Sequence, residues 1–226
     1  GSIVLGAWAD LSAAAPHLLR GLEPPSHPDE YILRLDNYAL LTGTTRSAVL
    51  FAAQTFVQVL AGHETRHVPG ALFRDAPVVG RRAFALDLTA CSVNVQALSR
   101  LIGLLQSFKA NRLHLFLEPV VPRRRSGGPG TITAADARTL AELADSYGVA
   151  LVPWADLASA IQAGSLTPGS AWEIATRLAD ALGTPAVGIG FAPPPPEAAD
   201  PGPVRELLER LLAPGDAAQS VYATDA

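Results

Sequence analysis

The segment from Pro77 to Leu117 decides the fold of this 226-residue chain. Its two ends read PVVGRRAFALDL (77–88) and FKANRLHLFL (108–117). Between them, apolar residues recur at the spacing of one helical face, at Leu98, Leu101, Ile102, Leu105 and Phe108. An extended run, an amphipathic helix and a second extended run make a strand–helix–strand unit, with polar residues near the strand ends, where α/β folds place their chemistry. The segment therefore predicts a parallel β/α fold.

The same alternation continues toward the C-terminus. Extended runs follow at 149–154 and 185–191, and helical patterns cover 133–147, 168–182 and 204–212. Four β/α units are therefore expected over residues 77–226. A closed (β/α)₈ barrel needs about 250 residues, so this stretch supplies about half of one. The sheet is expected to be open, to be closed by a second copy or by further chain, or to belong to a fragment.

Residues 1–76 predict a separate, small α+β domain. The runs 31–36 and 38–42 have the pattern of strands, and 47–60 has apolar residues at helical spacing, with Gly62 as its stop. The expected fold class is α/β: a small α+β domain followed by a partial, half TIM-type (β/α) barrel.

These motifs together resemble the N-terminal part of the family-20 glycoside hydrolases, the β-N-acetylhexosaminidases. Asn111-Arg-Leu-His114-Leu is similar to the family's Asn-Xaa-Xaa-His-Xaa-His-Leu, and the helix at 47–60 carries Gln54, Thr55 and Gln58, similar to the helix that precedes the family's barrel. The resemblance implies a carbohydrate partner of the N-acetylhexosamine type and a secreted or cell-envelope location, although no signal peptide is visible.

The resemblance also assigns three substrate-binding positions. Arg82 corresponds to an arginine that holds sugar hydroxyls, Asp87 to a strand-end aspartate, and His114 to the first histidine of the motif. Each has a structural alternative: a surface arginine, a cap or buried ion-pair partner, and a hydrogen-bonded core histidine. Phe116 occupies the place of the motif's second histidine.

The catalytic motif of the family is not matched. An adjacent Asp-Glu pair after strand four orients the substrate's acetamido group and protonates the leaving oxygen, and an apolar residue cannot replace that acid. Ala192 and Pro193 stand at those positions, and Glu118 and Glu197 are the remaining carboxylate candidates. The sequence thus predicts a non-catalytic homologue or a fragment that binds sugar. A structural module that assembles through the open barrel edge and a glycosidase with relocated carboxylates are the alternatives.

Composition excludes several other classes of protein. Apolar residues make up 49% of the chain and charged residues 17%, which is typical of a globular protein. The net charge of −4 does not favour a nucleic-acid partner, and no apolar run reaches the roughly 20 residues that span a membrane. The single cysteine, Cys91, excludes an internal disulfide and is expected to be a packed thiol.

Two further motifs are incomplete. The sequence HETRH (63–67) matches the zinc-protease pattern, but Phe73 stands at the position of a third ligand, and Pro69 disfavours a helix through the motif. Gly188 and Gly190 lack the third glycine of a dinucleotide fingerprint, since Pro193 stands there. We therefore expect no metal and no cofactor.

Overall fold

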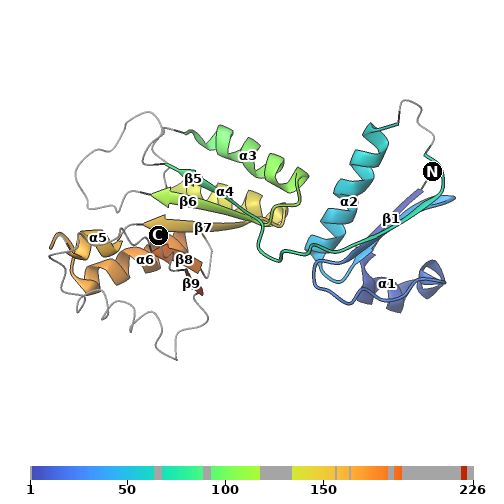
Figure 1. Cartoon of the computed structure of the whole chain (residues 1–226), viewed down its shortest axis with the longest axis horizontal. Coiled ribbons are helices and arrows are strands. Elements are labelled where there is room, and N and C mark those ends of the chain that lie inside the picture. Colours follow the sequence, from blue (N-terminus) through green and yellow to red (C-terminus); the bar gives the residue numbers. More distant parts are fainter. Residues whose placement is uncertain are drawn as a thin grey trace. The chain divides into compact units, whose positions relative to one another are not determined.

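The computed structural model describes residues 2–63, 68–88, 93–117, 134–155, 157–162, 164–182, 186–189 and 220–222. The chain divides into two compact units. The first unit contains residues 1–82 and 103–111, and the second contains residues 83–102 and 112–226. Figure 1 labels the helices and strands of the chain where there is room.

The first unit is a four-stranded mixed sheet with helices on both faces. Its strands are β1 (Ser2–Ala7), β2 (Tyr31–Leu35), β3 (Tyr38–Gly43) and β4 (Ala71–Asp75), in the order β1-β3-β2-β4. β1 is parallel to β3, and the other two pairs are antiparallel. The helices are α1 (Trp8–Ala14) and α2 (Arg46–Ala61), with a 3₁₀ turn at Pro16–Leu19.

Alternation along the strands gives this sheet two apolar faces. Leu33 and Leu41 point to one face and pack with Phe51 of α2, whereas Leu40 points to the other face and packs with Leu11 of α1. The start of α2 is determined locally, because the side chain of Thr45 accepts a hydrogen bond from the Ala48 amide at 3.2 Å. The predicted α+β unit with strands at 31–36 and 38–42 and a helix at 47–60 therefore agrees with β2, β3 and α2 to within a residue or two.

Gly43 lets α2 approach the end of β3. A Cβ atom at this position would lie 2.5 Å from the Cβ of Ala48 and 3.0 Å from the carbonyl oxygen of Glu30. No side chain fits in that space, so the turn between β3 and α2 needs glycine here.

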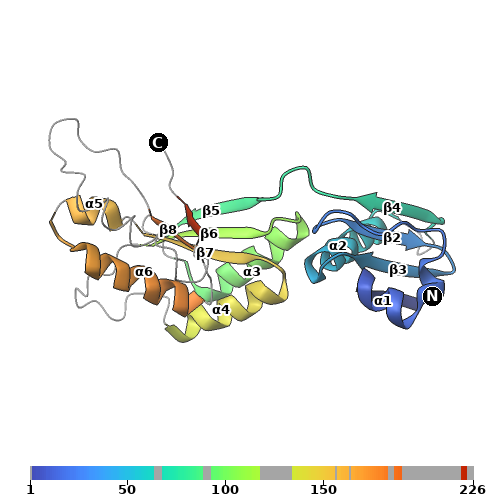
Figure 2. The ribbon, with the colours of Figure 1, turned by 90° about the horizontal axis from the view of Figure 1, so that it is seen from below.

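The second unit is a parallel sheet built from β/α units. Its strands are β5 (Ala83–Asp87), β6 (Arg112–Leu117), β7 (Ala150–Ala155), β8 (Ala186–Ile189) and β9 (Ser220–Tyr222), in sequence order across the sheet. The helices are α3 (Val95–Ser107), α4 (Ala134–Ser146), α5 (Leu157–Gln162) and α6 (Pro168–Leu182). Residues 103–107, the end of α3, belong to the first unit. Figure 2 shows α3, α4 and α6 together on one side of this sheet.

The predicted fold class is confirmed: a small α+β unit is followed by parallel β/α units of a partial TIM-type barrel. The sequence analysis did not predict α1, β4, α5 or β9, which are all short elements. The helix expected at 204–212 lies outside the described residues. No helix in the described part of the chain is long and apolar enough to cross a membrane.

Three helices in the described part of the chain end in the same backbone motif. After α3, α4 and α5, one residue adopts a positive φ, and the next amide bonds to the carbonyl five residues before it. Glycine fills this position after α4 and α5, at Gly148 (φ 68°) and Gly164 (φ 68°), but Lys109 (φ 57°) fills it after α3. The Lys109 ammonium donates to the Tyr31 hydroxyl at 2.6 Å and lies 3.3 Å from the Asp75 carboxylate. Contacts of the lysine side chain therefore offset the strain of its backbone.

A pair of variants at Lys109 separates the effect of its side-chain contacts on stability from the effect of its backbone strain. We expect Lys109→Ala to lower the free energy of unfolding by about 1 kcal/mol, because it loses the contacts and keeps the strained φ. Lys109→Gly is expected to be about 1 kcal/mol more stable than Lys109→Ala, since it loses the same contacts and relieves the strain. Urea denaturation of both variants measures the difference, and equal stabilities would contradict this account.

Candidate functional site

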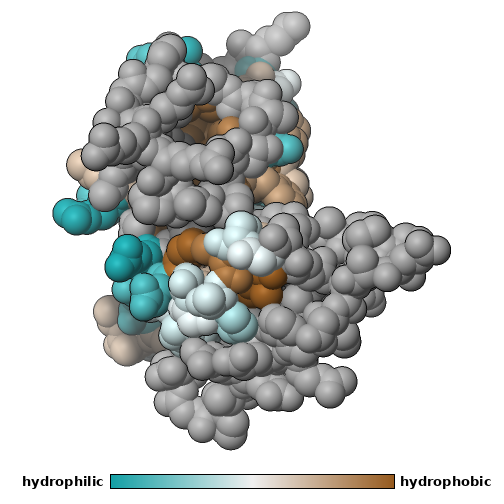
Figure 3. Space-filling model, turned by 90° about the vertical axis from the view of Figure 1, so that its left-hand side faces the viewer, coloured by the Kyte–Doolittle hydropathy of each residue, from teal (hydrophilic) through white to brown (hydrophobic). Residues whose placement is uncertain are grey.

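The carboxyl ends of β5, β6 and β7 bring three chemically distinct side chains into one row. The register of the sheet places Asp87 beside Phe116 and Phe116 beside Trp154. One step earlier on the same face, His114 lies between Ala85 and Val152. This is the edge of a parallel sheet where α/β proteins carry binding groups. Figure 3 looks onto the end of the molecule toward which these strands point and shows apolar side chains beside hydrophilic ones.

The row lies on the sheet face that is turned away from the helices. Leu113 and Leu115 alternate with His114 and Phe116, and they are only 0% and 2% exposed. Their burial assigns them to the helix-covered side that Figure 2 shows, so His114 and Phe116 point to the opposite side. Phe116 is 36% exposed there, whereas Trp154 is 3% exposed. Phe116 and the exposed Asp87 are therefore the accessible members of the row.

Aromatic stacking orders the middle of this site. The rings of Phe116 and Trp154 have centroids 5.4 Å apart with an interplanar angle of 20°, and those of His114 and Trp154 are 5.5 Å apart at 27°. Such offset stacks contribute about 1 kcal/mol each beyond area burial and hold large rings in fixed positions. Trp154 is thus the central ring, and the rings of His114 and Phe116 both stack against it.

A hydrogen bond determines which ring nitrogen of His114 carries the proton. The indole N–H of Trp154 donates to Nδ1 of His114 at 2.8 Å, so Nδ1 carries no proton and the neutral ring has its proton on Nε2. Burial of the imidazole, together with the positive charge of nearby Arg112, lowers the pKa of His114. The ring is therefore neutral at pH 7, which suits a partner that holds Trp154 in place.

Arg82 lies in the first unit, and protein groups hold its side chain there. Its Nε donates to the Lys109 carbonyl at 2.7 Å, and Nη1 donates to the Val79 carbonyl at 2.8 Å. Both Nη atoms are 3.3 Å from the Asp29 carboxylate, and the guanidinium lies 5.2 Å from the centroid of the Phe51 ring. Of the three predicted sugar contacts, Asp87 and His114 lie on neighbouring strands of the second unit's sheet, and Arg82 precedes that sheet.

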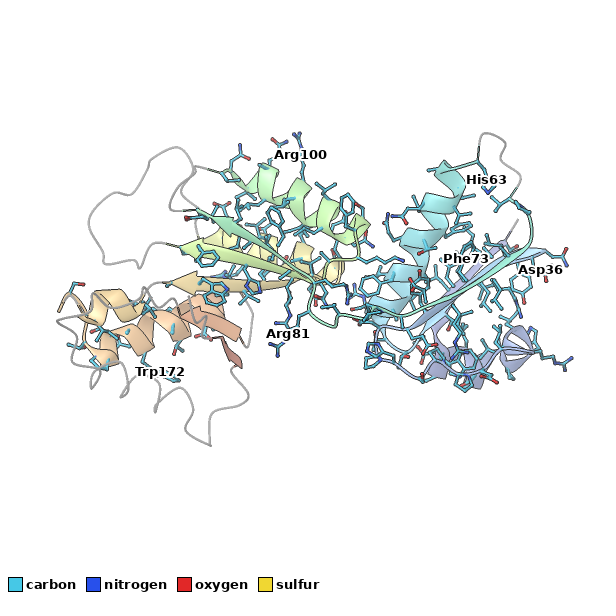
Figure 4. All side chains as sticks on the ribbon, viewed as in Figure 1. Asp36, His63, Phe73, Arg81, Arg100 and Trp172 are labelled. Carbon is cyan, nitrogen blue, oxygen red and sulfur yellow. The ribbon has the colours of Figure 1, made fainter. Side chains whose placement is uncertain are left out.

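Several predicted positions lie outside the described residues. They include the carboxylate candidates Glu118 and Glu197, the motif positions Ala192 and Pro193, and Cys91. The zinc-protease pattern is described only at its first member, His63, which follows α2, while Phe73 lies on β4 (Figure 4). Within the described ranges, no three His, Cys, Asp or Glu side chains are placed to hold a metal ion.

Trp154 is the site residue that sequence reasoning did not identify. The predicted strand at 149–154 ended on this tryptophan, and a large aromatic residue at the carboxyl end of a parallel strand is the signal that could have marked it. Its partner Phe116 was noticed only as a replacement for a histidine.

No family model and no curated protein matches the amino-acid sequence. Solved structures do match the fold. A family-20 β-N-acetylglucosaminidase aligns with 99% of this chain and 61% of its own, at 21% identity and a TM-score of 0.67. The family-20 exo-β-N-acetylglucosaminidase of Vibrio harveyi, solved in complex with N-acetylglucosamine, aligns with 93% of this chain and 41% of its own, at 17% identity and a TM-score of 0.64.

The family-20 β-N-acetylhexosaminidase of Streptomyces coelicolor A3(2) aligns with 74% of this chain and 46% of its own, at 19% identity and a TM-score of 0.56. The chain thus spans about half the length of the structures that it matches. At these identities the similarity establishes the fold: the chain resembles family-20 β-N-acetylhexosaminidases and has a glycoside hydrolase-like fold.

Proposed function

We propose that this chain is a carbohydrate-binding homologue of the β-N-acetylhexosaminidases, and that it binds N-acetylhexosamine sugars without hydrolysing them. The observation that carries the proposal is the row of Asp87, Phe116 and Trp154 at the carboxyl ends of β5, β6 and β7. The fold shared with family-20 enzymes supports the class of ligand.

The chemistry of the row suits a pyranose ring. The C–H groups of a sugar face pack against an aromatic ring, and the accessible ring is Phe116, held in place by the buried Trp154. The Asp87 carboxylate accepts hydrogen bonds from hydroxyl or acetamido N–H groups. His114 is a positioning residue, because the hydrogen bond from Trp154 orients the indole.

The sequence supports the part of the proposal that excludes hydrolysis. Substrate-assisted cleavage requires a protonated carboxylic acid at the leaving oxygen and a carboxylate that orients the acetamido group. Under the alignment of the motif, Ala192 and Pro193 stand at these two positions, and neither can donate or accept the proton. These two residues therefore favour sugar binding without turnover.

Titration with N-acetylglucosamine, followed by NMR or tryptophan fluorescence, tests the proposal. We expect saturable binding in the wild type and at least about 10-fold weaker binding in both Phe116→Ala and Asp87→Asn, since each removes a direct contact. Phe84→Ala is the matched control, because Phe84 is 46% exposed on β5 but lies beside Leu113, on the helix side of the sheet.

Three outcomes would contradict the proposal. The wild type could show no saturable response, or Phe84→Ala could weaken binding as much as Phe116→Ala does. Release of the aryl group from an aryl N-acetylglucosaminide would instead establish an active glycosidase with relocated carboxylates, among which Glu118 and Glu197 would be the first to substitute.

A further inference from the structure

The contact between His114 and Trp154 depends on the protonation state of His114. Nδ1 of His114 accepts the indole N–H of Trp154 at 2.8 Å. Only the neutral imidazole can accept this bond, because both ring nitrogens of an imidazolium carry protons. Protonation of His114 would place an N–H of the imidazole against the N–H of the indole. The hydrogen bond that orients Trp154 therefore exists only while His114 is neutral.

The three strands around His114 carry two charged groups on its face of the sheet. On β6, Arg112 lies two residues before His114, and burial of the imidazole together with this positive charge lowers the pKa of His114. On β5, Asp87 lies two residues after Ala85, which is the neighbour of His114. On β7, Val152 lies beside His114, and none of the six residues of this strand is ionisable. These surroundings keep His114 neutral at pH 7 and leave its protonation to a more acidic pH.

A change in the orientation of Trp154 would also move Phe116. The rings of these two residues stack with their centroids 5.4 Å apart. Because Trp154 is only 3% exposed, its indole lies in a closely packed space and cannot turn without displacing the rings packed against it. Phe116 is the accessible ring of the row. The position of the ring that is proposed to contact the sugar therefore depends, through Trp154, on His114.

We infer that protonation of His114 releases Trp154 and weakens sugar binding, so that the row binds its ligand at neutral pH and releases it in acid. This inference rests on the proposed function, because it concerns the regulation of the same site. The sugar binds the chain with neutral His114, so a proton on His114 and the sugar oppose each other's binding. Below the midpoint of the His114 titration, the binding-competent fraction falls about 10-fold for each pH unit, and the apparent dissociation constant rises by the same factor.

NMR of the free chain in a pH titration tests the first step, the release of Trp154. We expect the imidazole resonances of His114 and the indole N–H resonance of Trp154 to shift with one common midpoint. The indole of Trp8, in the first unit, is the internal reference and should not follow that midpoint. A Trp154 resonance that stays constant while His114 titrates would overturn the inference. A His114 ring that takes up no proton at any pH at which circular dichroism shows a folded chain would overturn it as well.

Titration with N-acetylglucosamine across the same pH range tests the second step, the weakening of binding. We expect the dissociation constant of the wild type to rise with the midpoint measured by NMR. His114→Asn should lose this pH dependence, because Oδ1 of asparagine takes the place of Nδ1, accepts from the indole and does not titrate. His17→Asn is the matched control, since His17 is exposed on the 3₁₀ turn of the first unit, and it should keep the wild-type pH dependence.

Asp87→Asn separates the histidine from the carboxylate of the same row. This variant binds the sugar more weakly but should still lose affinity in acid, because His114 is unchanged. A pH dependence that disappears in Asp87→Asn and persists in His114→Asn would overturn the inference, and so would a wild-type dissociation constant that is equal on both sides of the His114 midpoint. Neither result would contradict sugar binding itself. The absence of saturable binding at every pH would contradict the proposed function, and the inference would fall with it.

Discussion

Replacing Glu30 with glutamine is expected to lower the free energy of unfolding of the first unit by about 3 kcal/mol at pH 7. Glu30 is 6% exposed, and both of its carboxylate oxygens are occupied. Oε2 accepts from the Ser26 amide at 2.6 Å and from the His27 amide at 3.1 Å, while Oε1 accepts from Nε of Arg74 at 2.6 Å. Glutamine keeps the shape but cannot accept hydrogen bonds at both positions, and it leaves the Arg74 charge without its partner.

The same contacts make the unit sensitive to acid. Burial of Glu30 alone would raise its pKa, but hydrogen bonds from the Ser26 amide, the Arg74 side chain and the His27 amide outweigh burial and lower the pKa to about 2. The ordinary value of 4.5 applies in the unfolded chain. The stabilisation is therefore complete above about pH 4.5 and is lost as the pH falls toward 2, by about 2 to 3 kcal/mol in all.

Urea denaturation at pH 7 and at pH 3, followed by circular dichroism, measures both effects. We expect the wild type to lose stability between these values and Glu30→Gln to lose less, because it has no carboxylate to protonate at this position. Asp36→Asn is the control, since Asp36 is exposed just after β2 and its substitution should change stability by less than about 0.5 kcal/mol (Figure 4). Equal acid sensitivity in Glu30→Gln and the wild type would contradict the assignment.

Arg82→Ala is expected to lower the stability of the first unit by about 3 kcal/mol. The side chain is 19% exposed and combines an ion pair with Asp29, a hydrogen bond to the Lys109 carbonyl and a cation–π contact with Phe51. Arg82→Lys should recover only part of this loss, because an ammonium cannot reproduce the fork of donors on a planar guanidinium. Arg81→Ala, at the exposed neighbouring position, is the matched control and should have a small effect.

The same variants decide between two roles for Arg82. If the residue is structural, folded Arg82→Ala binds N-acetylglucosamine as the wild type does, and only its midpoint of urea denaturation falls. If binding is lost while the midpoint stays unchanged, Arg82 contacts the sugar, as the family resemblance implies. Binding and denaturation are therefore measured on the same preparation.

The order of helices and strands could be predicted from the sequence because it depends on local periodicity. Leu98, Ile102 and Leu105 mark one face of α3, and the segment 83–87 has the apolar composition of a strand, although β5 is mostly exposed at the edge of its sheet. Short elements gave no such signal: β9 has three residues, Ser220–Tyr222, and only its pairing with β8 makes it a strand. The backbone conformation of a residue can also depend on distant contacts. Lys109 adopts the positive φ that glycine usually adopts, and its side chain contacts Tyr31 and Asp75.

The site was predictable only in part. His114 and Asp87 were identified by their positions in motifs, and the structure places both on the same face of one sheet. Trp154 lies 40 residues from His114 in the chain, and no local pattern links them. Arg82 was predicted to bind sugar from its position just before β5. Its contacts in the structure are with Asp29 and Lys109, which lie 53 and 27 positions away in the chain.

The sequence by itself determined the longer strands and helices, the resemblance to family-20 hexosaminidases, and the presence of Ala192 and Pro193 at the positions that the motif alignment gives to that family's acid pair. These are properties of neighbouring residues, which the chain carries whether or not it is folded. Only the tertiary structure decided that Phe116 and Asp87 share a row with Trp154 and that Asp29 holds Arg82. Strand order and register bring distant residues together. Both depend on the pairing of whole strands more than on any local pattern in the sequence.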